Sequence, residues 1–132
     1  LINLKKIFIS SDHAGYQLKE VIKLNLIKKK LRIFDLGPSS NKKVDYPAYA
    51  HKLARHVQKN RNHRGILICG SGTGMCIVAN KYKKIRAAQC FNEKSTKLSR
   101  LHNDANIITL GSRLISKKKC FIVYKHFFKN KI

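Results

Sequence analysis

The glycine-rich stretch at residues 65–74, Gly-Ile-Leu-Ile-Cys-Gly-Ser-Gly-Thr-Gly, is the feature that most constrains the fold. An aliphatic run ends in Cys69, glycines follow at every second position, and residues 75–80 have the pattern of a helix start. This order is typical of a buried parallel strand, a turn and a helix. Because glycine lacks a Cβ and tolerates positive φ, the N–H groups of the turn can converge on an anion. The sequence therefore predicts an anion-binding loop with the Cys69 thiol at its mouth.

Two interpretations of this stretch stay open. The N–H groups of the loop would stabilise a thiolate at Cys69, which would then act as a base or nucleophile. A free cysteine at the end of a buried strand is, however, also a common small core residue. The spacing G-x-G-x-G matches neither the dinucleotide fingerprint nor a P-loop, and the four cysteines lack the pairing of a zinc site. The residues thus indicate no metal and no dinucleotide cofactor.

The rest of the chain alternates between strand and helix patterns. Strands are expected at residues 6–10, 31–36, 65–69, 85–90 and 107–110, and helices at 16–30, from 45, and at 75–80, 93–101 and 116–128. Asp45, which precedes Tyr46 and Pro47, is expected at a helix N-cap. Five β-α units with right-handed crossovers predict a three-layer α/β/α sandwich with a five-stranded parallel Rossmann-like sheet. We expect one domain over residues 1–132, since no linker or repeat interrupts the pattern.

The net charge of +23 is the most unusual feature of the composition. Such an excess is typical of proteins that bind nucleic acid or an anionic surface. Here it comes mainly from 22 lysines, against 7 arginines, and the lysines are spread over every segment, which favours a solvated surface. Lysine, isoleucine and asparagine also have AT-rich codons, so codon bias accounts for much of the charge. No apolar run approaches the roughly 20 residues of a membrane span. We therefore expect a cytoplasmic protein without a membrane or nucleic-acid partner.

Polar segments follow several of the predicted strands. In open α/β sheets, ligands bind beyond the carboxyl ends of the strands, and the segments after the first, third and fifth strands contain Asp12 and His13, the glycine loop, and Arg113. Each segment has a structural alternative, because Asp12 can cap a helix and Arg113 can pair with a carboxylate. His102, at the end of a predicted helix, is by itself more typical of a capping cation than of a site residue. Three such segments at one edge nevertheless predict a site for a sugar or phosphate.

Several short motifs occur in a definite order along the chain. They are Ser11-Asp12-His13-Ala14-Gly15, Asp45-Tyr46-Pro47, the stretch 65–74, Ala79-Asn80-Lys81, Ile85-Arg86-Ala87-Ala88, the run His-Asn-Asp-Ala-Asn at 102–106, and Leu110-Gly111-Ser112-Arg113. Together they resemble ribose-5-phosphate isomerase type B, in a family that includes galactose-6-phosphate isomerase subunits. The resemblance implies an aldose–ketose isomerase that interconverts ribose 5-phosphate and ribulose 5-phosphate in the pentose phosphate pathway. A six-carbon sugar-phosphate isomerase is one alternative, and a degraded isomerase that binds nucleic acid or another anion is the other.

The resemblance also implies a role for each site residue. Cys69 would be the base that moves a proton between C2 and C1 of the open-chain sugar, and His102 would open the sugar ring. The enediolate oxygen would be stabilised by the Ser71 hydroxyl and by the backbone amides of the loop, at Gly70, Ser71, Gly72, Thr73 and Gly74. No metal or organic cofactor is implied, because the chemistry consists of proton transfers.

The remaining positions would bind substrate. The resemblance implies that Asp12 orients sugar hydroxyls, that Tyr46 packs on the sugar, and that His13, Asn103 and Arg113 hold hydroxyls or the phosphate. Members of the family are homodimers with shared sites. The segments with His102, Asn103 and Arg113 would accordingly come from the neighbouring chain.

Two departures from the family pattern stand out. Ser71 occupies a position that is commonly threonine, which keeps the hydroxyl. Members of the family usually continue past the last helix into a Gly-Gly-Arg-His segment and a further arginine that clamp the phosphate, whereas this sequence ends with Lys-Asn-Lys-Ile at 129–132. We therefore expect a C-terminal tail that is shortened relative to the family, and a weaker hold on the phosphate.

Overall fold

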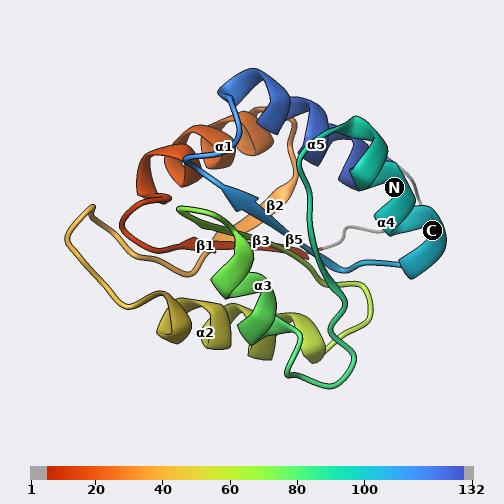
Figure 1. Ribbon diagram of the computed structural model, residues 1–132, viewed down its shortest axis with the longest axis horizontal. Helices are drawn as coiled ribbons and strands as arrows, with labels where there is room; N and C mark the ends of the chain where they lie inside the picture. The colour runs from red at the N-terminus through yellow and green to blue at the C-terminus, as the bar shows by residue number, and fades with distance from the viewer. Residues whose placement is uncertain (1–5, 130–132) are drawn as a thin grey trace.

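The computed structural model describes residues 6–129, in which strands and helices alternate strictly (Figure 1). The elements are β1 (Lys6–Ser11), α1 (Tyr16–Lys28), β2 (Arg32–Asp35), α2 (Tyr46–Gln58), β3 (Arg64–Cys69), α3 (Thr73–Ala79), β4 (Ala87–Gln89), α4 (Glu93–Asn103), β5 (Ile107–Gly111) and α5 (Lys117–Lys129). The α/β class predicted from the sequence is confirmed. The expected domain limits at 1 and 132 and the shortened tail fall outside the described residues.

The strands form one parallel sheet in the order β2-β1-β3-β5-β4. Strand β3 lies at the centre with all six residues buried, and its Ile66 pairs with Ile9 of β1 on one side and with Ile108 of β5 on the other. From β1 the chain first runs outward to β2 and then returns to place β3 on the opposite side. The carboxyl ends of β1 and β3 therefore flank a topological switch point, where open α/β sheets bind their ligands.

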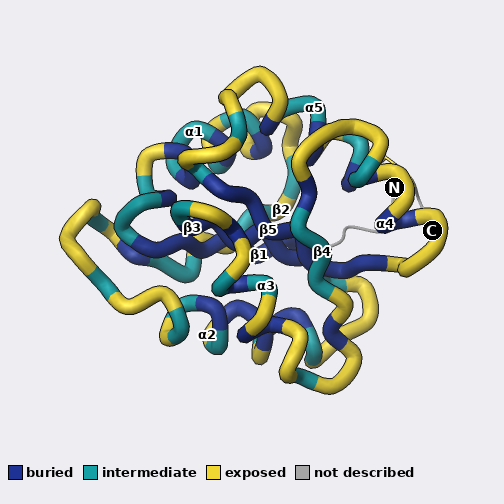
Figure 2. Tube along the Cα trace, viewed as in Figure 1, coloured by how far each residue is buried: buried dark blue, intermediate teal, exposed yellow. Residues whose placement is uncertain are grey.

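Helices cover both faces of the sheet (Figure 1). On one face, α1 and α5 enclose a core cluster that includes Ile22, Ile66 and Phe127, and α4 packs beside α5. On the other face, α2 and α3 enclose a second cluster that includes Leu53 and Met75. Figure 2 shows the central strands as the most deeply buried part of the molecule.

Successive side chains of β3 point to opposite faces of the sheet. Ile66 and Ile68 belong to the cluster under α1 and α5, while Leu67 and Cys69 belong to the cluster under α2 and α3. Cys69 is the last residue of the strand, so its thiol lies at the carboxyl edge of the sheet on the α3 side.

Several element limits differ from those predicted. Helix α1 ends at Lys28, two residues early, and Lys30 adopts φ 63° in the turn that follows. Strand β4 is shorter than the expected 85–90, because the backbone N–H of Arg86 donates to the Asn106 side chain (2.8 Å) outside the strand ladder. Asp45 stands at the N-cap of α2 as predicted, but its side chain makes no capping hydrogen bond. Within residues 6–129 the longest helices have 13 residues, too few to span a bilayer.

A buried lysine joins α1 to the end of β2. Lys19 is 0% exposed, and its Nζ donates to Asp35 Oδ1 (2.9 Å) and Oδ2 (2.8 Å) and to Glu20 Oε2 (2.9 Å). Lys23 Nζ also contacts Asp35 Oδ2 at 2.7 Å. Burial alone would raise the pKa of Asp35, but hydrogen bonds from Lys19, Lys23 and the Gly37 N–H outweigh it and hold that pKa below its ordinary value. The two carboxylates therefore stay ionised and compensate the buried ammonium.

Candidate active site

A pocket of about 450 Å³ opens at the carboxyl edge of the sheet, at the switch point. The residues that line it come from the segments after β1, β3 and β5 and from the start of α2: Asp12, Tyr46, Cys69, Gly70, Ser71, Gly74, Arg113 and Leu114. The sequence predicted that the three segments after β1, β3 and β5 meet at one edge, and the resemblance added Tyr46. Leu114 was not among the predicted residues, and nothing in its local sequence marks it out.

The thiol of Cys69 sits under the glycine loop. Its Sγ accepts a hydrogen bond from the backbone N–H of Gly72 at 3.1 Å, and the residue is 5% exposed. Gly72 adopts φ 82°, which a residue with a side chain rarely takes, and α3 begins at the next residue. The loop therefore turns the backbone N–H of Gly72 towards the sulfur, where it can stabilise negative charge.

Two glycines of the loop let side chains from other segments come close. A Cβ on Gly70 would lie 2.8 Å from Nη1 of Arg113, and a Cβ on Gly74 would lie 2.7 Å from ring atoms of Tyr46. The guanidinium and the ring therefore lie directly against the loop. This packing places one cation and one aromatic ring at the pocket that contains Cys69.

Main-chain hydrogen bonds fix the segment after β5 to the glycine loop. The Ser112 N–H donates to the Cys69 carbonyl at 2.8 Å, and the Arg113 N–H donates to the Gly70 carbonyl at 3.0 Å. The expectation that Arg113 serves the site of a neighbouring chain is therefore wrong. Strand β5 lies beside β3, with Gly111 opposite Cys69, so the residues after β5 lie at the pocket of their own chain.

Asp12 and His13 follow β1 directly. The Asp12 N–H donates to the Ile68 carbonyl at 3.1 Å, and the Asp12 carboxylate accepts from the Gly15 N–H at 2.9 Å, just before α1. Asp12 thus closes the turn into the helix and also lines the pocket. His13 Nδ1 lies 3.2 Å from both the N and the O of Val44. His13 is half-buried beside Asp12 and is not itself among the lining residues.

Gln89 braces the outer side of the glycine loop. Its Nε2 donates to the Ser71 carbonyl at 2.7 Å and to Thr73 Oγ1 at 2.9 Å, while the Thr73 N–H donates to Ser71 Oγ at 3.2 Å. Sequence reasoning missed Gln89, although its place at the end of β4 puts it at the same edge of the sheet. These hydrogen bonds orient the side chains of Ser71 and Thr73 in the loop.

His102 and Asn103 lie away from the pocket. They are the last two residues of α4, and both are exposed. Because α4 returns from the carboxyl end of β4 to the amino end of β5, its C-terminus lies at the opposite edge of the sheet from Cys69. Within residues 6–129, the pocket therefore gains nothing from His102 or Asn103 of the same chain.

The other three cysteines differ from Cys69 in their surroundings. Burial raises the pKa of the Cys76 and Cys90 thiols, and it raises the pKa of Cys120 to about 12. These thiols stay protonated at neutral pH and do not line the pocket. In the part of the chain that the structure describes, no group of three or more His, Cys, Asp or Glu side chains is placed to bind a metal ion.

The parallel sheet and the pocket at its switch point define an α/β protein with a cavity of small-molecule size at the carboxyl ends of its strands. The model of the ribose/galactose isomerase family matches residues 7–132. The chain therefore belongs to this family, as the sequence motifs predicted.

Relatives with assigned names support the same placement. The chain is 46% identical over 110 residues to a probable ribose-5-phosphate isomerase B of Mycoplasma pneumoniae, covering 83% of this chain and 72% of the relative. It is 42% identical over 112 residues to ribose-5-phosphate isomerase B of Escherichia coli, covering 85% of this chain and 75% of the relative. The crystal structure of ribose-5-phosphate isomerase B from Mycoplasma genitalium with bound ribulose-5-phosphate is similar, with a TM-score of 0.92, 40% identity, and coverage of 96% of this chain and 85% of that one.

Proposed function

We propose that this protein is an aldose–ketose isomerase that interconverts ribose 5-phosphate and ribulose 5-phosphate, as a cytoplasmic enzyme of the pentose phosphate pathway. The observation that carries the proposal is the Cys69 thiol, which accepts the Gly72 N–H at 3.1 Å in a pocket that also holds Arg113. A base beside preorganised donors is what an enediolate reaction requires. The names of the relatives support the pentose phosphate substrate.

In this mechanism the thiolate of Cys69 removes the proton on C2 of the open-chain aldose. The resulting enediolate carries negative charge on oxygen, which the loop amides and the Ser71 hydroxyl stabilise. The thiol then returns a proton to C1, while a hydroxyl proton passes from O2 to O1, and the product is the ketose. Every step is a proton transfer, so the proposed reaction needs no metal and no organic cofactor.

The substrate is held by the groups around the thiol. Asp12 accepts hydrogen bonds from sugar hydroxyls, and the ring of Tyr46 packs against the carbon chain. Arg113 and His13 bind the phosphate, since an arginine fork forms two directional hydrogen bonds to phosphate oxygens. The guanidinium of Arg113 already lies against Gly70, at the pocket that contains Cys69.

We further propose that the active unit is a homodimer. The proposed ring-opening acid, His102, does not reach the pocket of its own chain, because it lies at the opposite edge of the sheet. A second copy that presents its own His102 and Asn103 would complete the site. Leu101 is 76% exposed and precedes His102, and an apolar side chain so placed favours contact with another protein surface.

A six-carbon sugar phosphate remains the second candidate substrate. The family description names both ribose and galactose isomerases, and the pocket of about 450 Å³ has room for either sugar. A panel of ribose 5-phosphate, allose 6-phosphate and galactose 6-phosphate separates the two, because the preferred substrate has the highest kcat/KM.

The direct test is a coupled turnover assay with ribose 5-phosphate on the purified chain and on two variants. Cys69→Ala removes the proposed base and should lower kcat by at least about 100-fold, with the circular dichroism spectrum unchanged. Cys76→Ala removes a thiol outside the pocket and should keep near-parental turnover. Parental activity in Cys69→Ala would refute the assignment of Cys69 as the base. If the parent turns over none of the panel substrates, the proposed isomerase function is refuted.

A further inference from the structure

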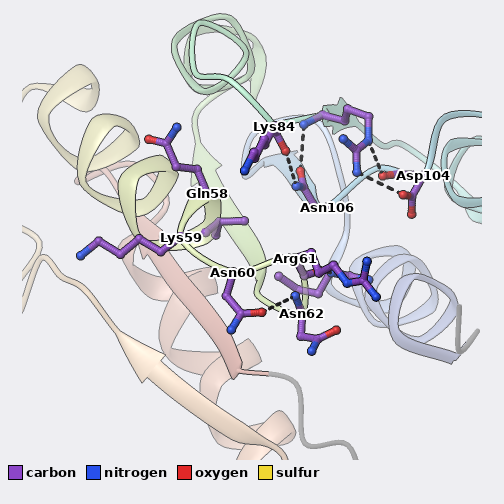
Figure 3. Close-up of a pocket in the computed structure, with 11 residues that line it drawn as sticks. Gln58, Lys59, Asn60, Arg61, Asn62, Lys84, Asp104 and Asn106 are labelled. Atoms are coloured by element: carbon purple, nitrogen blue, oxygen red, sulfur yellow. Dashed lines mark hydrogen bonds and ion pairs between the residues drawn. The ribbon is translucent and has the colours of Figure 1, made fainter.

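A second pocket, of about 570 Å³, lies at the opposite edge of the sheet from Cys69 (Figure 3). It is built where β3, β4 and β5 begin, by the end of α2, the loop after it, and the segments before β4 and β5: Val57, Gln58, Lys59, Asn60, Arg61, Asn62, Arg64, Lys84, Arg86, Asp104 and Asn106. Strand β3 runs from Arg64 at this pocket to Cys69 at the other, so about 17 Å of strand separates them at roughly 3.3 Å per residue. The two pockets are distinct.

The walls of this pocket are strongly cationic. Three arginines and two lysines line it, against one carboxylate, that of Asp104. The whole sequence has six Asp and Glu residues. The other five lie elsewhere: Asp12 in the Cys69 pocket, Glu20 and Asp35 with Lys19, Asp45 at the start of α2, and Glu93 with Lys97. Among residues 6–129, no second Asp or Glu side chain therefore lines this pocket.

The carboxylate of Asp104 is already engaged. Its Oδ2 lies 3.1 Å from Arg86 Nη2, and its Oδ1 lies 3.2 Å from Nη1 of the buried Arg100. Among residues 6–129, no hydrogen bond or ion pair involves the side chains of the other exposed cations of the pocket, Lys59, Arg61 and Lys84. In Figure 3, Lys59 and Lys84 stand on separate segments, and the Lys59 side chain extends outward, away from Lys84.

Arg64 adds a buried charge to this group. It is 7% exposed, and its Nη1 donates to the carbonyls of Arg61 (2.8 Å) and His63 (2.9 Å) rather than to a carboxylate. Burial and the charges of Arg100 and Arg86 lower the pKa of Arg64, and Asp104 opposes this effect. Because a buried charge without a counterion is costly, an anion in this pocket would stabilise the protein.

We propose that this pocket binds a small, multiply charged phosphate ligand, such as a pyrophosphate or a nucleoside diphosphate. Its volume falls within the roughly 300–1,000 Å³ of small-molecule sites, and its cations surround one cavity instead of forming a stripe. The side-chain amides of Gln58, Asn60 and Asn62 provide neutral donors for phosphate oxygens. Asn106 fixes the segment before β4, because its amide donates to the Lys84 carbonyl and accepts from the Arg86 N–H, both at 2.8 Å. This proposal does not rest on the isomerase assignment.

The test is isothermal titration calorimetry of the full chain with pyrophosphate at low ionic strength. Lys59→Gln/Lys84→Gln removes two exposed cations of the pocket. It should raise the dissociation constant at least about tenfold, since each charge-assisted contact contributes to affinity. The control, Lys28→Gln/Lys94→Gln, removes the same charge from exposed positions outside the pocket and should change affinity less than about twofold.

A third variant separates this pocket from the proposed active site. Arg113→Gln should leave the pyrophosphate site intact, because Arg113 lines the other pocket. Any of three results would overturn the proposal: no saturable binding by the parent, equal weakening in both double variants, or loss of the site in Arg113→Gln. Binding of a single-stranded RNA oligonucleotide that pyrophosphate does not displace would point to a nucleic-acid surface and would also overturn it.

Discussion

Replacing Lys19 by methionine tests how the buried ammonium contributes to stability. Methionine keeps the length of the side chain but removes three charged hydrogen bonds, two to Asp35 and one to Glu20. At about 1.5–3 kcal/mol for each such bond, the gross loss is about 4.5–9 kcal/mol. The substitution also removes the desolvation penalty of the ammonium, which is several kcal/mol.

Two further features of the network reduce the net effect. The side chains of Asp35 and Glu20 are 24% and 33% exposed, so water can replace part of what Lys19 donated. Lys23 also still reaches both carboxylates. We therefore expect Lys19→Met to lower the free energy of unfolding by about 2 kcal/mol at pH 7, which corresponds to a fall in Tm of about 6–10 °C for a chain of this length.

The pH dependence of the loss identifies its cause. Burial alone would raise the pKa of Glu20, as it would that of Asp35, but the lysines outweigh it and both pKa values lie below their ordinary values in the folded protein. Stability from these groups is therefore present above the unfolded pKa values and is lost as pH falls through the folded ones. The difference in free energy of unfolding between parent and variant should therefore be largest at pH 7 and smaller at about pH 3.5.

Urea denaturation followed by circular dichroism measures this gap at both pH values. Lys28→Met, at an exposed position of the same helix, is the control and should stay within about 0.5 kcal/mol of the parent. A gap of equal size at pH 7 and pH 3.5 would mean that packing, and not ion pairing, accounts for the role of Lys19. A variant as stable as the parent at pH 7 would refute the reasoning altogether.

Three further predictions concern the proposed site and the glycines around it. If His102 serves the site of a partner, mixing inactive Cys69→Ala and His102→Ala chains should restore activity, because the heterodimers have one intact site. If subunit exchange is demonstrated and activity does not return, the shared-site proposal is contradicted. Gly74→Ala should displace the Tyr46 ring and lower kcat/KM at least about tenfold with the fold retained, because alanine suits helix α3 and the ring can move outward. In contrast, Gly111→Ala meets a backbone carbonyl at 2.5 Å and should lower Tm, so thermal melting and kinetics together distinguish the two glycines.

Much of the fold could be predicted because its signals are local. The apolar run before Cys69 and the glycines after it specify a strand, a turn and a helix within ten residues. The rule that parallel strands present their carboxyl ends at one edge then places Asp12 and Arg113 near Cys69, and the pocket does contain all three. The catalytic and binding roles themselves stay predictions.

What the sequence did not indicate depends on contacts between distant segments. Nothing in the local sequence distinguishes Lys19 from the solvated lysines. It is buried because it pairs with Asp35, which lies sixteen residues away at the end of another element. Gln89 has no motif around it, and it reaches the glycine loop only because β4 and β3 flank β5. The cations at the start of β3 likewise form a group only after α2 and the segment before β4 have packed together.

The two hydrogen bonds that join the segment after β5 to the glycine loop have a consequence for how this site can change. Both run between main-chain atoms, from the N–H groups of Ser112 and Arg113 to the carbonyls of Cys69 and Gly70. Their geometry does not depend on which side chains stand at 113 and 114. Single substitutions of the exposed Leu114 can therefore reshape the wall of the pocket while the thiol and its donors keep their places. The shape of the pocket at Leu114 is thereby separated from the main-chain bonds that hold the glycine loop in place.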